Sequence, residues 1–276
     1  MDALKGVKAI IFDLDGTLYQ ENEIMCYDLI REFVKGSPYE PLADEMIEAV
    51  NEILEGKWEL KCGHFVEKKP VEGEVSVKNL LNVPSVSGLS RDNVYDYFDR
   101  KKYSHIGDGC TLAMFIGHRL NLSSAEFWIR FNRVRKKMLI PGCGPGRSGL
   151  VIAMMNQLRD AGIRLLLCTN SSHKNSNDLL LQLGLLDRFD EVIHDAHKPA
   201  GLADRIELLK KYEGLQPEEI LLVGDQGYND LFMGYQMGTR TMLVSDNVID
   251  DGIPWTYRVH TVEEMAEALH IREPLE

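Results

Sequence analysis

Residues 8–20, KAIIFDLDGTLYQ, place two aspartates, Asp13 and Asp15, two positions apart just after a short apolar run. A continuous apolar run of this length, bounded by polar residues, is typical of a strand that is buried on both faces of a parallel sheet. Carboxylates repel each other and are costly to remove from water. A buried strand that ends in two of them therefore needs positive charge nearby.

Apolar runs elsewhere in the chain predict the remaining strands, and amphipathic segments between them predict helices. The predicted strands span residues 7–12, 162–170, 189–195, 218–225 and 239–245. The predicted helices span residues 146–162, 174–185, 202–212, 227–238 and 261–270, and Gly184 and Gly238 stand where helix C-termini are expected. This alternation predicts an α/β fold, a Rossmann-like parallel sheet with helices on both faces.

Residues 20–141 interrupt that pattern. They contain helical patterns at 41–56, 90–102, 111–120 and 122–138, and only weak strand-like alternation at 57–81. The glycines and prolines of residues 140–149, IPGCGPGRSG, indicate a hinge where the segment ends. We therefore expect a core domain of residues 1–19 and 142–276, with residues 20–141 as an inserted, mostly helical cap.

Composition limits the classes of function. The 276 residues carry a net charge of −12, which argues against a protein that binds nucleic acid or anionic membranes. A small phosphorylated substrate is compatible with this charge, because one local group of cations suffices to bind it. The five cysteines are scattered and include no CxxC pair, and no apolar run resembles a signal peptide or a membrane span. We expect a cytoplasmic protein with reduced thiols, and the sequence does not indicate its oligomeric state.

Polar groups suited to chemistry follow the predicted strands. They are Asp13 and Asp15, Thr169 and Asn170, Lys198, and Asp225 followed by Asp230. In open parallel sheets the carboxyl ends of the strands meet at one edge, where ligands bind, so we expect these groups to converge. Lys198 supplies one positive charge, and a hard divalent cation with oxygen ligands, Mg²⁺, is the best candidate for the rest.

A calcium loop is the alternative for the D-x-D-G pattern. An EF-hand loop that started at Asp13 would need glutamate at its twelfth position, which is Ile24, and a helix before it rather than a strand. The catalytic interpretation is therefore preferred. In the inserted segment, Arg130, Arg133 and Lys137 share a helical face that we expect to be exposed to solvent rather than bound to substrate.

Four short motifs carry a family resemblance. They are DLDGT, the Thr169 that ends LLLCT, the lysine of HKP, and GDQGYND, in this order along the chain. The chain resembles the haloacid dehalogenase superfamily, over residues 1–19 and about 142–250, with an insertion in the position used by its beta-phosphoglucomutase-like branch. Four ordered motifs are far more specific than any one of them alone.

The resemblance implies a role for each acidic residue. Asp13 is expected to be the nucleophile that forms an aspartyl-phosphate, and Asp15 the general acid and then the general base. The Asp15 backbone carbonyl, Asp13 and Asp225 resemble the family's Mg²⁺ ligands. Asp230 is expected to complete the site directly or through water.

The resemblance also implies which residues bind the phosphate. Thr169 and Lys198 are expected to contact it and to take part in catalysis, and backbone amides around Gly16, together with Asn170, are expected to help hold it. The function implied is a Mg²⁺-dependent phosphatase that acts on a small phosphate monoester.

Other functions of the same fold stay open. A phosphomutase is the nearest alternative, and a non-catalytic binding protein comes from a different class. A phosphonatase would need a cap lysine that forms a Schiff base, and no lysine stands out for that role. Asp15 argues against dehalogenation, because dehalogenases of the family typically lack the second aspartate.

Overall fold

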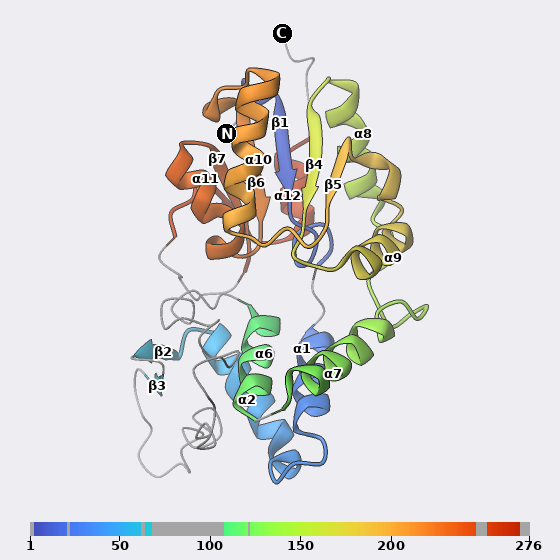
Figure 1. Cartoon of the computed structure of the whole chain (residues 1–276), viewed down its shortest axis with the longest axis vertical. Coiled ribbons are helices and arrows are strands. Elements are labelled where there is room, and N and C mark those ends of the chain that lie inside the picture. Colours follow the sequence, from blue (N-terminus) through green and yellow to red (C-terminus); the bar gives the residue numbers. More distant parts are fainter. Residues whose placement is uncertain are drawn as a thin grey trace. The chain divides into compact units, whose positions relative to one another are not determined.

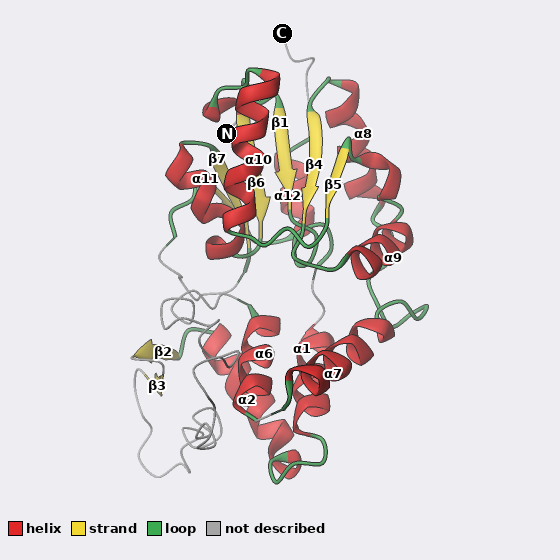
Figure 2. Ribbon diagram, in the orientation of Figure 1, coloured by secondary structure: helices red, strands yellow, loops and turns green. Residues whose placement is uncertain are grey.

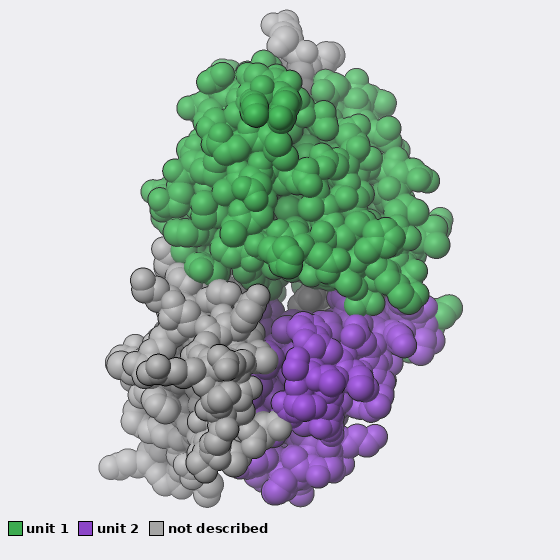
Figure 3. All heavy atoms as spheres, viewed as in Figure 1, with its two compact units in different colours: residues 1–21, 141–246, 252–276 green, residues 22–140, 247–251 purple. Residues whose placement is uncertain are grey.

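A computed structural model describes residues 3–20, 23–61, 64–67, 108–120, 122–246 and 253–270 of the chain. The chain divides into two compact units, which Figure 3 colours separately. The first comprises residues 1–21, 141–246 and 252–276, and the second comprises residues 22–140 with 247–251. A segment from the middle of the chain therefore forms nearly all of the second unit. No helix among the described residues is both long enough and apolar enough to cross a membrane.

The first unit is built on a six-stranded sheet in the order β5-β4-β1-β6-β7-β8 (Figures 1 and 2). The strands are β1 (Ala9–Phe12), β4 (Arg164–Cys168), β5 (Glu191–Ile193), β6 (Ile220–Gly224), β7 (Arg240–Val244) and β8 (Tyr257–Val259). Every neighbouring pair runs parallel. The parallel α/β sheet and five of its strands are thus confirmed, whereas β8 was not predicted.

Helices cover both faces of this sheet. They are α8 (Gly149–Asp160), α9 (His173–Leu183), α10 (Ala200–Glu213), a π-helical turn (Gly227–Leu231), α11 (Phe232–Met237) and α12 (Val262–Ala268). Figure 1 shows α10 in front of the sheet and α12 behind it. Helices α9 and α11 end at Gly184 and Gly238, which have φ angles of 72° and 82°, as the sequence predicted.

The burial of β1 explains why its run is apolar throughout. Successive side chains of a strand point to opposite faces of the sheet. On one face Ala9 and Ile11 join a cluster with Ile206 of α10, and on the other Phe12 packs edge to face against Phe189. Because β1 lies between β4 and β6, its carboxyl end is central to the edge at which polar residues were expected.

The described residues of the second unit are mostly helical (Figure 2). It contains α1 (Glu23–Val34), α2 (Ala43–Leu54), α6 (Gly109–Arg119), α7 (Ser124–Lys137) and an antiparallel pair of strands, β2 (Trp58–Lys61) and β3 (His64–Glu67). Helix α1 contacts α2, α6 and α7. The helices predicted at 41–56, 111–120 and 122–138 are confirmed, the one at 90–102 lies outside the described residues, and α1 was not predicted.

The cationic face of α7 contacts α1. Nη1 of Arg130 donates to three carbonyl oxygens at the C-terminal end of α1, those of Glu32 at 2.7 Å, Phe33 at 3.1 Å and Lys35 at 2.8 Å. Arg133 pairs with Glu32, and Lys137 Nζ lies 2.9 Å from Asp28 Oδ2. The expectation of a solvent-exposed face holds for Arg133 and Lys137, with side chains 56% and 51% exposed. It is wrong for Arg130, which is 17% exposed because it caps a neighbouring helix.

Candidate active site

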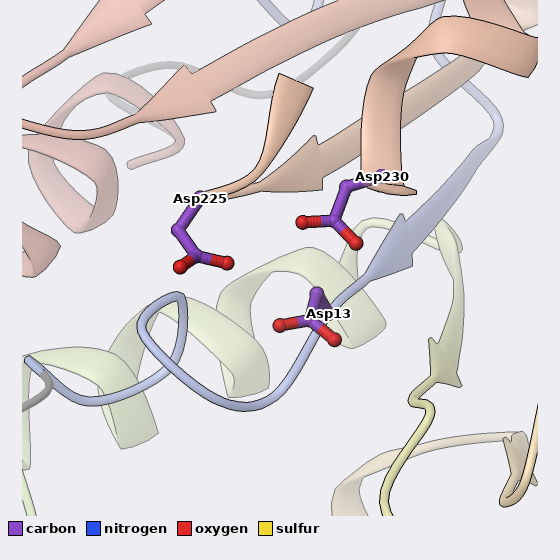
Figure 4. Close-up of side chains that lie close together, drawn as sticks. All are labelled: Asp13, Asp225 and Asp230. Carbon is purple, nitrogen blue, oxygen red and sulfur yellow. The ribbon is translucent and has the colours of Figure 1, made fainter. Parts of the chain in front are cut away.

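Three aspartates converge at the carboxyl edge of the sheet (Figure 4). Asp13 directly follows β1, and its N–H donates to the Val223 carbonyl of β6 at 2.9 Å, which extends the strand pairing to the site. Asp225 directly follows β6, and Asp230 lies in the π-helical turn. One carboxylate oxygen from each of the three lies within 4.8 Å of the others. The convergence expected from the strand ends is therefore present.

Lys198 bridges two of these carboxylates. Its Nζ lies 2.5 Å from Asp13 Oδ1 and 2.5 Å from Asp230 Oδ1, and its side chain is 4% exposed. Burial alone would lower the pKa of this ammonium, but Asp13 and Asp230 outweigh burial and raise the pKa above its usual value. The lysine therefore stays charged and ties the end of β1 to the π-helical turn.

One ammonium does not balance three carboxylates. Burial, Lys198, Asp230 and Asp15 together set the pKa of Asp13 at about 7, because burial and the two neighbouring carboxylates raise this pKa by more than Lys198 lowers it. A site with such an excess of negative charge and only oxygen donors has the chemistry that a hard divalent cation such as Mg²⁺ prefers. The donor set of Asp13, Asp225 and Asp230 thus fits a metal of this kind.

Two glycines make room for the carboxylates. A Cβ on Gly16, which has a φ angle of +77°, would lie 2.4 Å from Asp225 Oδ2. A Cβ on Gly224 would lie 2.2 Å from the Cβ of Asp230. Both distances are shorter than any van der Waals contact, so only glycine allows the aspartates their positions.

The π-helical turn fixes Asp230 within its own segment. The Gln226 N–H donates to Asp230 Oδ2 at 2.9 Å, and the Asp230 N–H donates to the Gln226 carbonyl at 2.8 Å. Single π turns occur often at functional sites. Here the turn leaves the second carboxylate oxygen, Oδ1, to contact Lys198.

The loop that carries Lys198 has an unusual backbone. Asp195 and His197 have φ angles of 46° and 53°, in the left-handed region that non-glycine residues rarely adopt. Hydrogen bonds to the loop after β4 hold them there. The Ala196 N–H donates to the Thr169 carbonyl at 3.0 Å, and the Asp195 N–H donates to the Ser171 carbonyl at 3.1 Å.

The Asn170 side chain binds the backbone of Lys198 on both sides. Its Oδ1 accepts from the Lys198 N–H at 2.7 Å, and its Nδ2 donates to the Lys198 carbonyl at 3.4 Å. The amide thus positions the lysine loop, and its predicted contact with phosphate stays a prediction. The buried Thr169 hydroxyl accepts from the Ser171 N–H at 3.1 Å, so its own proton can be donated to another group.

Asp15 lies outside the acidic cluster and is half-buried. Its Oδ2 accepts a hydrogen bond from Ser171 Oγ at 2.7 Å, and its Oδ1 accepts one from Tyr19 OH at 2.6 Å. Neither hydroxyl was predicted from the sequence to take part in the site. Tyr19 belongs to the same short stretch as the two aspartates, but nothing in the stretch indicates that its ring folds back onto Asp15.

The family model of the haloacid dehalogenase-like hydrolases matches residues 7–238 of the chain. Among curated proteins, none matches the chain at a significant level.

Solved structures resemble the chain over nearly its whole length. A predicted phosphoglycolate phosphatase from Haemophilus somnus 129PT is 17% identical with a TM-score of 0.54, and the match covers 97% of this chain and 100% of that one. The HAD-hydrolase YfnB from Bacillus subtilis, bound to magnesium, is 16% identical with a TM-score of 0.51, over 96% and 99%. An L-2-haloacid dehalogenase is 14% identical with a TM-score of 0.51, over 95% and 98%. At these identities the likeness shows a shared fold.

Proposed function

Because the chain belongs to the haloacid dehalogenase-like hydrolases, we propose that it is a Mg²⁺-dependent phosphatase that hydrolyses a small phosphate monoester. The observation that carries the proposal is the contrast between its two neighbouring aspartates. Asp13 lies in the buried cluster beside Lys198, whereas Asp15 lies outside the cluster and accepts from two hydroxyl groups. Two carboxyl groups in different surroundings are suited to different tasks, here nucleophile and proton carrier.

The first step forms a covalent intermediate. An oxygen of Asp13 attacks phosphorus, the bond from phosphorus to the ester oxygen breaks, and the leaving oxygen takes a proton from Asp15. In the second step water attacks the phosphorus of the aspartyl-phosphate and gives one proton to Asp15, while the bond from phosphorus to the Asp13 oxygen breaks. Inorganic phosphate leaves, and both aspartates return to their starting states.

Other residues of the chain position and stabilise the phosphoryl group in this proposal. Lys198 holds Asp13 in place and offsets negative charge beside it, and the Thr169 hydroxyl donates to a phosphoryl oxygen. Asp13, Asp225 and the Asp15 carbonyl would hold Mg²⁺, and Asp230 would complete that site directly or through water. When bound, the cation supplies the positive charge that lets an anionic nucleophile meet an anionic substrate.

Dehalogenation is another reaction carried out by proteins of similar fold. The solved structures of similar fold include a phosphatase and a dehalogenase, so the fold does not separate the two. Asp15 favours the phosphatase, because an alkoxide needs a proton to leave whereas a halide ion, a much weaker base, does not. The excess of carboxylates over cations also favours a metal-assisted reaction on an anionic phosphate.

The substrate belongs to the proposal as well. A net charge of −12 disfavours a nucleic-acid or membrane partner and leaves a small phosphorylated metabolite as the substrate class. We assign residues 20–141 as a cap of the beta-phosphoglucomutase-like kind, which selects that metabolite.

The experiment that tests the proposal is phosphate release from a panel of phosphate monoesters, with Mg²⁺ or with EDTA. We expect turnover that requires Mg²⁺ and that falls at least about 10³-fold in Asp13→Asn. Folded protein that releases no phosphate from any ester, or equal turnover by Asp13→Asn, would refute the phosphatase. A phosphoenzyme that transfers its phosphate to a second sugar phosphate and not to water would instead identify a mutase.

A further inference from the structure

Both oxygens of the Asp15 carboxylate accept a hydroxyl proton, from Tyr19 at 2.6 Å and from Ser171 at 2.7 Å. The two donors come from different parts of the fold. Tyr19 lies four residues further along the loop that follows β1, whereas Ser171 lies in the loop that follows the neighbouring strand β4. Two separate elements therefore meet on one side chain.

Each donor is itself held in place. The Tyr19 residue is only 5% exposed, so its ring has little room to move. The Ser171 backbone is fixed from both sides, because its N–H donates to Thr169 Oγ1 at 3.1 Å and its carbonyl accepts from the Asp195 N–H at 3.1 Å. Hydroxyl donors whose residues are held in this way restrict the orientation of the Asp15 carboxylate that they contact.

We infer that Tyr19 and Ser171 are positioning residues that hold the Asp15 carboxylate in the orientation needed for its two proton transfers. The inference rests on the proposed function, in which Asp15 first donates and then accepts a proton. The terminal torsion of an aspartate is broad and has no sharp rotamer wells. One hydrogen bond would leave this torsion loose, whereas a fixed donor on each oxygen sets it.

A purely structural role explains these contacts less well. Asp15 is half-buried, so water can reach its carboxylate and folding does not require protein donors for it. Both contacts also remain possible when Asp15 carries its proton, since a hydroxyl group accepts as well as donates. The arrangement thus suits both states of a residue that exchanges a proton in each half of the cycle.

The test uses Tyr19→Phe and Ser171→Ala, each of which removes one hydroxyl, in the full-length protein with Mg²⁺. Tyr212→Phe and Ser172→Ala are matched controls, because both residues are exposed and lie outside the site. Ser171→Thr keeps the hydroxyl and should restore most of the rate. Circular dichroism and Mg²⁺ affinity show whether each variant is folded with its acidic cluster intact.

For an alkyl phosphate we expect each test variant to lower kcat about 10-fold or more while KM changes little. Each variant loses one hydrogen bond to Asp15, which transfers protons in the reaction and is not assigned to substrate binding. With p-nitrophenyl phosphate the leaving group needs no proton, so the first step stays fast. The variants should then release a burst of about one p-nitrophenolate per site and continue slowly, because water still needs Asp15 as a base.

A loss of burst rate and steady-state rate in equal proportion would show a general structural defect and overturn the positioning role. Variants that match wild type would also overturn it. If the wild type itself turns over no ester, the proposed phosphatase fails and the positioning role fails with it. If the wild type is active and the variants match it, only the positioning role fails, so the two failures are distinguishable.

Discussion

Gly16 and Gly224 shape the acidic cluster as much as its aspartates do. A Cβ added to either glycine would collide with an aspartate, at 2.4 Å from Asp225 Oδ2 for Gly16 and at 2.2 Å from the Asp230 Cβ for Gly224. In the D-L-D-G and G-D motifs the aspartates thus supply the charge, and the glycines leave the room that the aspartates occupy. A substitution that adds one methyl group should therefore damage the site without removing any of its ligands.

We predict that Gly16→Ala displaces Asp225, weakens Mg²⁺ binding and lowers turnover by at least about 100-fold, since a shift of about 1 Å in a catalytic group has an effect of this size. Mg²⁺ affinity by calorimetry and kcat measure the two effects. Gly162→Ala is the matched control, because Gly162 has the same positive φ of +76° but no atom within 4 Å of the added Cβ. Equal losses in both variants would mean that backbone strain, not the clash with Asp225, is responsible.

Helix α7 stabilises the second unit through its contacts with α1. The last carbonyl groups of a helix lack partners within the helix itself. Arg130 supplies partners for three such groups near the end of α1, while Arg133 makes a single ion pair with Glu32 from an exposed position. The two arginines lie on the same face of α7, yet their environments predict very different contributions to stability.

We predict that Arg130→Ala lowers the free energy of unfolding of the second unit by about 2 kcal/mol, because three carbonyl groups at the end of α1, two of them in half-buried hydrogen bonds, lose their donor. Arg133→Ala should lower it by less than about 1 kcal/mol, as is usual for an exposed ion pair. Urea unfolding of both variants measures the difference. A loss from Arg133→Ala as large as that from Arg130→Ala would contradict the assignment of Arg130 as a helix cap.

His118 makes the packing of α6 against α7 sensitive to pH. Its ring stacks on Phe127 with centroids 4.1 Å apart, and burial lowers the pKa of His118 to about 4 from its ordinary value of 6.5. Between these values the unfolded chain binds the proton and the folded chain does not. Stability therefore rises with pH across this window and is lost as the pH falls through it.

We predict that the free energy of unfolding decreases between pH 7 and pH 5 by about 2 kcal/mol more in the wild type than in His118→Phe. The variant keeps an aromatic ring at this position but has no side chain that binds a proton there. Urea unfolding at both pH values checks this. The same loss in wild type and variant would show that His118 is not the group that responds.

At the scale of the whole molecule, Mg²⁺ should act on stability as well as on catalysis. A ligand that binds only the folded state at 100 times its Kd adds about 2.7 kcal/mol of stability, which raises Tm by about 5 °C or more for a unit of this size. Asp225→Asn should show little of this shift. A thermal scan with Mg²⁺ and with EDTA measures it, and an equal shift in Asp225→Asn would place the metal elsewhere.

The core of the fold was predictable from the sequence because its strands are buried on both faces. AIIF, RLLLC and ILLVG form continuous apolar runs, and each was identified as a strand. β8 was missed because Tyr257–Val259 is only three residues long and has an arginine at its centre. Helix α1 was missed although Met25, Leu29 and Phe33 repeat every four residues, a helical signal that was present in the chain.

At the site, the strand ends predicted which groups converge, because parallel strands align their carboxyl ends. They did not predict how side chains outside the strands turn. The contacts of Tyr19 and Ser171 with Asp15, and of Asn170 with the Lys198 backbone, depend on loop conformations set by tertiary packing. Left-handed residues such as Asp195 and His197 give no compositional signal, unlike glycine.

In the proposed mechanism Asp13 carries a phosphoryl group during turnover, and this group can be trapped. Asp15→Asn is suited to the experiment, because p-nitrophenyl phosphate can still phosphorylate the enzyme while hydrolysis of the intermediate is slowed. After an acid quench, mass spectrometry of the peptides should find one added phosphoryl group, on the peptide that contains Asp13. Wild-type turnover without any trapped phosphoryl group in Asp15→Asn, or a phosphoryl group on another peptide, would contradict the account.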